Sequence, residues 1–231
     1  MVFAPSSLIL TNYHLPLSEA LAFGISMNTN HKPFVTFIIC FMTVCVSFYV
    51  AYQISGSILG KSKITELANF GGLTIEGIKN FEVWRLLSSQ LIHVHQKHMI
   101  YNVLSILFLG IIIERKVGSK YMLAIWLLAG AIGTLFSTQF TPPPWNTGTG
   151  ASQAAFGLAG FGLILVISKI KHGYLILSAL AFALIPALYL DFKSVGYPKA
   201  GHSLSFVIGC SLAIYYLYRI KPQYVHLAQK S

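Results

Sequence analysis

The chain has 231 residues, of which 55% are hydrophobic and only 10% are charged, against about 25% charged residues in a typical soluble domain. This composition is typical of a protein that crosses a membrane several times, and it excludes an ordinary soluble enzyme. The net charge of +10 is spread over the ends of apolar runs and forms no basic patch, so nucleic acid is not an expected partner. The three cysteines lie within apolar runs and show no disulfide or metal pattern.

Six apolar runs are long enough to cross a membrane as helices, which takes about 20 residues each. They form a predicted membrane domain over 34–220, between a cytoplasmic segment at 1–33 and a cytoplasmic tail at 221–231. The predicted spans are 34–58, 98–114, 119–140, 151–169, 173–191 and 200–219. The long connection at about 59–97 is too polar to span and too apolar around Trp84-Arg85 to be a solvated linker. We expect it to form a partly helical segment at the membrane surface.

Basic residues in the short loops predict the orientation. The loop between the third and fourth spans has no charge, whereas basic residues follow the second, fourth and sixth spans: Arg115, Lys116, Lys120, Lys169, Lys171, Arg219 and Lys221. The positive-inside rule therefore places both termini in the cytoplasm, with the protein in a plasma or inner membrane. Lys193 and Lys199, together with Asp191, fall on the outer side in this arrangement.

Three polar residues open the spans that enter from the outer face. His98, Ser152 and His202 each stand 17 residues before a basic residue that marks the cytoplasmic end of the same span. At 1.5 Å per residue this is roughly 25 Å, slightly less than a bilayer core of about 30 Å. All three side chains are thus predicted at one depth below the outer surface. Polar side chains at such positions are functional candidates, and a serine with a histidine is the minimum pair for nucleophilic hydrolysis.

Neighbouring residues extend this candidate site. Asn102 is one turn after His98, so the two side chains share a helix face. Together with the backbone N–H of Ser152 they are able to hold an oxyanion, and the start of a helix also favours a developing negative charge. Phe156 lies four residues after Ser152, where its ring is able to pack against the imidazole of His202.

Each of these residues alone also has a purely structural interpretation. A serine at a helix start often caps the helix, and an asparagine in a membrane helix often bonds a neighbouring helix. His93, His95 and His98 cluster, but their spacing does not place all three on one helix face, so no metal and no cofactor are expected. A small transporter or channel is disfavoured because paired broken helices are missing from the sequence pattern.

In this order the residues closely resemble the rhomboid family of intramembrane serine proteases, from about Trp84 to Gly209. The resemblance implies a six-helix bundle around a water-filled cavity and the cleavage of transmembrane proteins by a serine–histidine dyad, without metal or cofactor. It also implies that no acidic residue joins the dyad, and that the loop 59–97 and the fifth helix form a lateral gate. The motifs that carry it are Trp84-Arg85, then His93, His98 and Asn102 as H-x4-H-x3-N, Glu114-Arg115-x-x-Gly118-Ser119, Gly150-Ala151-Ser152, and His202 with Gly209.

By position, the resemblance implies that Ser152 is the nucleophile and His202 the general base, with an oxyanion hole formed by His98, Asn102 and the Ser152 amide. Three positions depart from the family pattern. Gln153 replaces a glycine, Gly201 replaces an alanine, and Ser205 replaces a glycine. The alternative function is a catalytically inactive rhomboid-like protein that binds membrane clients.

Overall fold

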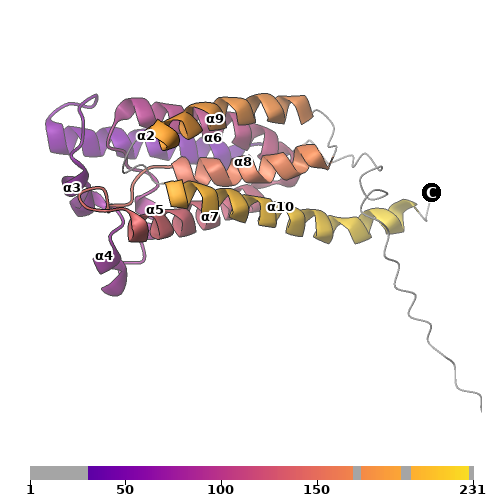
Figure 1. Ribbon diagram of the computed structural model, residues 1–231. Coiled ribbons are helices and arrows are strands. Elements are labelled where there is room, and N and C mark those ends of the chain that lie inside the picture. Colours follow the sequence, from indigo (N-terminus) through magenta and orange to yellow (C-terminus); the bar gives the residue numbers. More distant parts are fainter. Residues whose placement is uncertain (1–30, 169–172, 194–198, 229–231) are drawn as a thin grey trace, which may run out of the picture.

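The computed structural model describes residues 31–168, 173–193 and 199–228. Six long helices form a bundle in these residues (Figure 1). They are α2 (Phe34–Ser55), α6 (Gln96–Val117), α7 (Ser119–Phe140), α8 (Ser152–Ile167), α9 (Gly173–Lys193) and α10 (Lys199–Ala228). The predicted fold class, an all-α integral membrane protein, is confirmed, and no strand occurs in the described ranges beyond one isolated β-bridge.

The observed helix bounds differ from the predicted spans mainly at the polar ends. Helix α6 starts two residues before His98 and continues to Val117, and α10 runs on to Ala228, because backbone hydrogen bonding does not stop where an apolar run stops. Four helices are long and apolar enough to span a membrane by length and composition: α2, α7, α9 and the part of α10 from Ala200 to Arg219. Helix α8 is apolar but has only 16 residues.

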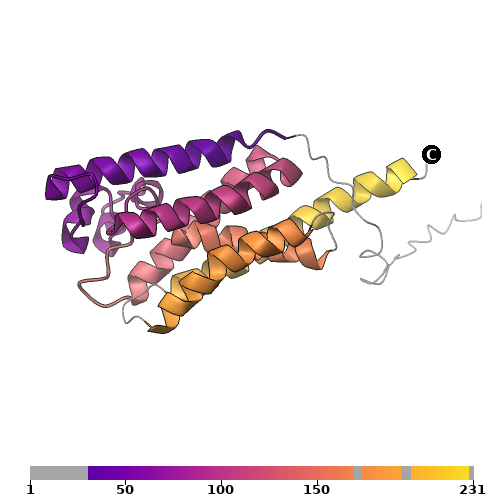
Figure 2. The ribbon, with the colours of Figure 1, turned by 90° about the horizontal axis from the view of Figure 1, so that it is seen from above.

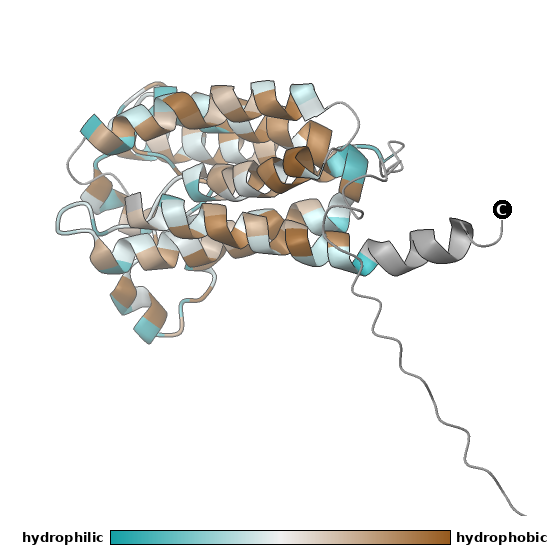
Figure 3. Ribbon diagram, turned by 45° about the vertical axis from the view of Figure 1, so that its right-hand side comes forward, coloured by the Kyte–Doolittle hydropathy of each residue, from teal (hydrophilic) through white to brown (hydrophobic). Residues whose placement is uncertain are grey.

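Helix α8 lies at the centre of the bundle and packs against α6, α7, α9 and α10, whereas α2 lies at one edge, mainly beside α6 (Figure 2). Most residues of α8 are buried around its whole circumference, as expected for a helix that is apolar on every face. The outer helices expose large apolar side chains, among them Phe41 and Ile185. In Figure 3, apolar residues, coloured brown, are frequent along the middle of the long helices. A bilayer requires such apolar side chains on the helix surfaces that face lipid.

Glycines bring α8 and α10 into backbone contact. A Cβ on Gly209 of α10 would lie 1.9 Å from the carbonyl oxygen of Gly157 on α8, and a Cβ on Gly160 would lie 2.1 Å from the carbonyl oxygen of Phe206. Only glycine leaves room for this approach, which is the usual way in which membrane helices pack closely. The crossing fixes the start of α10 relative to the start of α8.

The first loop forms a compact layer at the end of the bundle where α6, α8 and α10 begin, on the left in Figure 1. It contains α3 (Ile64–Leu67), the 3₁₀ turn η1 (Ala68–Phe70), α4 (Ile75–Lys79) and α5 (Arg85–Ser88). Arg85 holds these turns together: its Nη1 donates to the carbonyls of Ala68 and Gly72, at 2.6 and 2.8 Å, and its Nε pairs with Glu82. The predicted partly helical loop is therefore present. Cζ of the Arg85 guanidinium lies over the ring of Trp84, 4.7 Å from the ring centroid.

At the other end of the bundle, Glu114 joins three helices. Its side chain lies on α6 and is fully buried. It accepts hydrogen bonds from the backbone N–H groups of Val35 and Thr36, at 3.0 and 2.8 Å, and from the hydroxyls of Thr36 and Ser119, both at 2.6 Å. A carboxylate from α6 thus caps the first turn of α2 and contacts the first turn of α7, where it also meets the positive end of the α2 dipole.

Candidate active site

Ser152 and His202 meet at the start of two helices. Ser152 is the first residue of α8 and His202 lies in the first turn of α10, with 4% and 1% of their surfaces exposed. The Oγ of Ser152 lies 3.0 Å from Nε2 of His202. This is the distance at which an imidazole accepts a hydroxyl proton. The sequence places both residues at one depth, and the glycine-mediated crossing of α8 and α10 places them side by side.

The turn before α8 is fixed by the first loop. Leu73 and Gly148 exchange two backbone hydrogen bonds, at 2.9 and 2.8 Å, and the N–H of Gly150 donates to the carbonyl of Ser89 at 2.8 Å. Gly150 has a φ of +98°, a conformation that favours glycine. Trp84 and Arg85 do not line the cavity beside Ser152, and Arg85 instead holds together the loop that contacts this turn.

Phe156 orients the imidazole of His202. The two rings stack with centroids 4.2 Å apart and planes inclined by 6°. The contact arises because Phe156 is one turn below Ser152 on α8, under the ring that Ser152 touches. It restricts rotation of the imidazole about its Cβ–Cγ bond.

A carboxylate also contacts His202, which the resemblance did not lead us to expect. Asp191 lies in the last turn of α9, is 6% exposed, and has its two oxygens 2.7 and 2.9 Å from Nδ1 of His202. The expectation that no acidic residue joins the pair was wrong, because it rested on the family resemblance and on the scarcity of carboxylates within the spans, whereas Asp191 lies at the end of one. Counting residues does not find this contact, since Asp191 stands 20 residues after Lys171, whereas His202 stands 17 residues before Arg219.

His93 organises the opposite side of the site. The Oγ of Ser47 donates to the carbonyl of Leu91 at 2.8 Å, so its contact of 3.0 Å with Nδ1 of His93 must be a bond donated by the imidazole. The unprotonated Nε2 then accepts from the amide of Asn102 at 3.1 Å and from the N–H of Ala151 at 3.2 Å. Burial lowers the pKa of His93 well below its usual value, and His98 adds to this effect, so the ring is neutral. His93 therefore fixes which way the Asn102 amide points.

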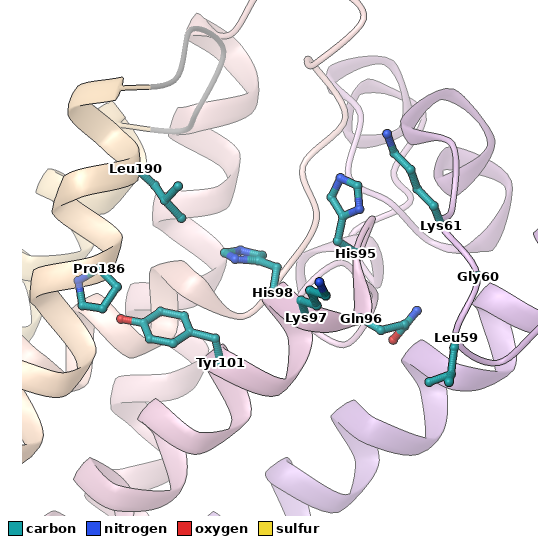
Figure 4. Close-up of a pocket in the computed structure, with 10 residues that line it drawn as sticks. All are labelled: Leu59, Gly60, Lys61, His95, Gln96, Lys97, His98, Tyr101, Pro186 and Leu190. Atoms are coloured by element: carbon teal, nitrogen blue, oxygen red, sulfur yellow. The ribbon is translucent and has the colours of Figure 1, made fainter.

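Two adjacent cavities lie at this end of the bundle. One, of about 390 Å³, is lined by Ser152, Gln153 and Gly150, and His98 reaches it from α6. The other, of about 570 Å³, lies between the first loop, the start of α6 and α9 (Figure 4). In Figure 4, His98 and Tyr101 of α6 face Pro186 and Leu190 of α9, and His98 and Leu190 line both cavities. Within the described ranges, no cluster of three histidine, cysteine, aspartate or glutamate side chains is placed to hold a metal ion.

A serine beside an imidazole, with hydrogen-bond donors nearby and a cavity lined by the serine, is able to perform acyl transfer. The model of the rhomboid domain family matches residues 80–219, more than half of the chain. The chain belongs to the rhomboid family. Members of this family are serine proteases, and some relatives are inactive.

Relatives of this rhomboid occur in bacteria and plants. The rhomboid protease GluP of Bacillus subtilis is 32% identical over 71% of this chain and 30% of its own length. RHOMBOID-like protein 4 of Arabidopsis thaliana is 30% identical over 83% of this chain and 48% of its own length. Inactive RHOMBOID-like protein 8 of Arabidopsis thaliana is 36% identical over 44% of this chain and 28% of its own length. The chain spans less than half the length of each of these relatives.

Two of the departures from the rhomboid pattern have a packing reason. A Cβ on Gly201 would lie 2.5 Å from the carbonyl oxygen of Gly133 on α7, so an alanine does not fit there. Ser205 uses the space above the same glycine, and its hydroxyl donates to the carbonyl of Ala129 at 2.9 Å. Both departures therefore replace one small residue with another where α10 packs against α7.

The third departure touches the nucleophile. Gln153 is 2% exposed, and its Oε1 lies 3.1 Å from the Oγ of Ser152. The Ser152 hydroxyl has a single proton and two acceptors, Oε1 of Gln153 and Nε2 of His202. A hydroxyl that donates to Gln153 does not donate to the base, so this residue competes with His202 for the proton.

Proposed function

We propose that this rhomboid is an intramembrane serine endopeptidase that cleaves transmembrane proteins with Ser152 and His202. The observation that supports it most directly is the contact of 3.0 Å between Oγ and Nε2 in a buried site beside a cavity. We further propose that both termini lie in the cytoplasm of a plasma or inner membrane, so that substrates are cut near their outer ends.

The proposed reaction proceeds in two halves. Nε2 of His202 takes the hydroxyl proton while Oγ of Ser152 bonds to the carbonyl carbon of the scissile peptide, and the carbonyl oxygen becomes an oxyanion. The imidazolium then gives its proton to the leaving nitrogen, the C–N bond breaks, and an ester to Ser152 remains. Water repeats the attack with His202 as base, and the proton finally returns to Ser152, which releases the new carboxyl end.

The proposed oxyanion hole consists of the Ser152 N–H and the side chains of His98 and Asn102. Asn102 is 2% exposed, and one of its amide hydrogens goes to His93, which leaves the other for a ligand. Donors preorganised in this way are usually worth about 10²–10³ in rate each. The start of α8 adds the positive end of a helix dipole at the same place.

A substrate helix has to lose its own backbone hydrogen bonds before Ser152 is able to reach a carbonyl carbon. We propose that it enters through the cavity between α6 and α9, with the first loop and α9 acting as the lateral gate. Substrates with small or helix-breaking residues near the cut should therefore be preferred over an unbroken polyleucine helix.

The function is tested by cleavage of a single-span substrate in detergent by purified protein, beside the Ser152→Ala variant. Loss of the nucleophile should lower the rate by at least about 10³-fold. Equal cleavage by the variant would contradict the assignment. A wild-type protein that neither cuts nor reacts with a fluorophosphonate would favour the alternative function, an inactive rhomboid-like protein that binds membrane clients.

The contact between Gln153 and Ser152 leads to a prediction about rate. Gln153→Met keeps most of the side-chain volume and removes the competing acceptor, so fluorophosphonate labelling of Ser152 should become about fivefold faster, the equivalent of one hydrogen bond of about 1 kcal/mol. Gln153→Glu, which keeps an acceptor at the same place, is the matched control and should not accelerate labelling. A slower reaction in Gln153→Met would show that the amide assists the serine instead of competing for its proton.

A further inference from the structure

The last turn of α9 presents a buried carboxylate to the imidazole on the side away from Ser152. Asp191 has 8% of its side chain exposed, and both of its oxygens are within hydrogen-bond distance of Nδ1 of His202. We propose that Asp191 is a positioning residue that acts through His202, so that this rhomboid uses a serine–histidine–aspartate set where the family pattern has a dyad. The inference rests on the proposed protease function.

The first argument concerns the tautomer of His202. An ionised carboxylate only accepts hydrogen bonds, so Nδ1 of His202 has to carry the hydrogen that points at Asp191. The other ring nitrogen, Nε2, is then bare and faces Oγ of Ser152 at 3.0 Å. Ring stacking on Phe156 fixes the plane of the imidazole but is equally compatible with either tautomer. The carboxylate selects the form that is able to take a proton from Ser152.

The second argument concerns charge. Proton transfer turns His202 into a cation in a site where its side chain is 1% exposed, and an unpaired charge is costly in such surroundings. A carboxylate 2.7 Å away forms an ion pair with the imidazolium at the moment it appears. Asp191 contacts the base, and it lines neither cavity although it follows Leu190 on α9, so it should act mainly on the chemical step and change substrate binding little.

A contact between α9 and α6 fixes the part of α9 that precedes Asp191. Pro186 has no backbone N–H, so the carbonyl of Phe182 four residues earlier lacks its helical partner. The hydroxyl of Tyr101 on α6 lies 3.0 Å from that oxygen and 2.5 Å from the carbonyl oxygen of Ala183. The tyrosine therefore docks the proline-containing part of α9 on α6, one turn and a residue before Asp191.

Few other ionisable groups face this pair among the described side chains. His98 approaches Asp191 and His202 from α6, and Ser152 faces the imidazole from α8. Lys193 lies two residues after Asp191 on α9, is exposed, and donates to the hydroxyl of Tyr189 at 2.9 Å. All of these groups remain when Asp191 alone is changed, so a change in the pH profile can be assigned to the carboxylate.

The test compares wild type, Asp191→Asn and Asp191→Glu in the cleavage assay over a range of pH. Asp191→Asn should lower kcat by about 10²-fold or more, with the loss of about 10⁴ known for serine proteases of the triad type as the upper limit, and should leave KM within about twofold. The acidic limb of its profile should move to lower pH, since a protonated His202 has lost the carboxylate that stabilises it. Asp191→Glu should recover part of kcat and return the limb toward that of wild type.

The outcomes separate this inference from the function on which it rests. Cleavage by wild type with unchanged kcat and pH profile in Asp191→Asn would overturn the inference alone, and a wild-type protein that neither cleaves nor labels would overturn both. If Asp191→Asn does not fold, ¹⁵N NMR of histidine-labelled wild type decides, with His202→Gln to assign the signal. Protonated Nδ1 with bare Nε2 supports the role of Asp191, whereas the opposite tautomer overturns it.

Discussion

Gly209→Ala is expected to abolish most of the cleavage activity and to lower the midpoint of thermal unfolding. By helix propensity alone this change should stabilise α10 by about 1 kcal/mol. However, the new methyl group would lie 1.9 Å from the carbonyl oxygen of Gly157, and backbone is unable to move aside as a flexible side chain would. Helices α8 and α10 must separate, at a cost of about 1–3 kcal/mol or more.

The separation reaches the active site because Gly209 is two turns along α10 from His202. A displacement of about 1 Å between nucleophile and base is enough to lower the rate by roughly 10²-fold. The cleavage rate and the unfolding midpoint in detergent measure both effects. Gly173→Ala is the matched control, since a Cβ there meets Val166 at an ordinary 3.9 Å. Full activity in Gly209→Ala would mean that the close crossing does not position the pair.

Glu114→Ala should cause the largest loss of stability among polar substitutions in the described part of the chain. Its carboxylate accepts four hydrogen bonds, from Val35, Thr36 and Ser119, and its removal takes the acceptor from the N–H groups of Val35 and Thr36 in the first turn of α2. Buried donors left unsatisfied in this way cost about 1–3 kcal/mol each where water does not replace the acceptor. We expect the free energy of unfolding to fall by about 3 kcal/mol.

Glu66→Ala serves as the control for Glu114→Ala. Glu66 forms an ion pair with Lys63 on the exposed surface of the first loop, 38% and 78% exposed, and such pairs contribute little. Its variant should unfold within about 0.5 kcal/mol of wild type. Below its unfolding temperature, Glu114→Ala should still be labelled at Ser152, because Glu114 is sixteen residues along α6 from His98, at the other end of the bundle. A loss of labelling without a loss of stability would contradict a purely structural role.

The residues of the proposed site differ in how much of their placement follows from the sequence. His98, Ser152 and His202 can be placed at one depth because helix rise is constant and basic residues mark the cytoplasmic ends. The position of Phe156 beneath the histidine follows from the i+4 spacing once Ser152 and His202 are taken to be paired. Asp191 does not follow from this rule, because it stands 20 residues from Lys171 instead of 17, and because a charged residue at the end of a span is indistinguishable by composition from one in a loop.

Fold class and helix order were determined by the sequence itself, since the length of an apolar run largely decides whether it crosses a bilayer. Only the tertiary structure decided which side chains touch. The contacts of Asp191 with His202 and of Gln153 with Ser152, and the bonds of His93 with Asn102 and Ala151, depend on rotamers and on how closely helices cross. Those crossings are set by volumes at Gly157, Gly160 and Gly209, whose neighbours are about fifty residues away in the chain. Periodicity within one helix carries no information about that distance, because the partner surface belongs to another helix.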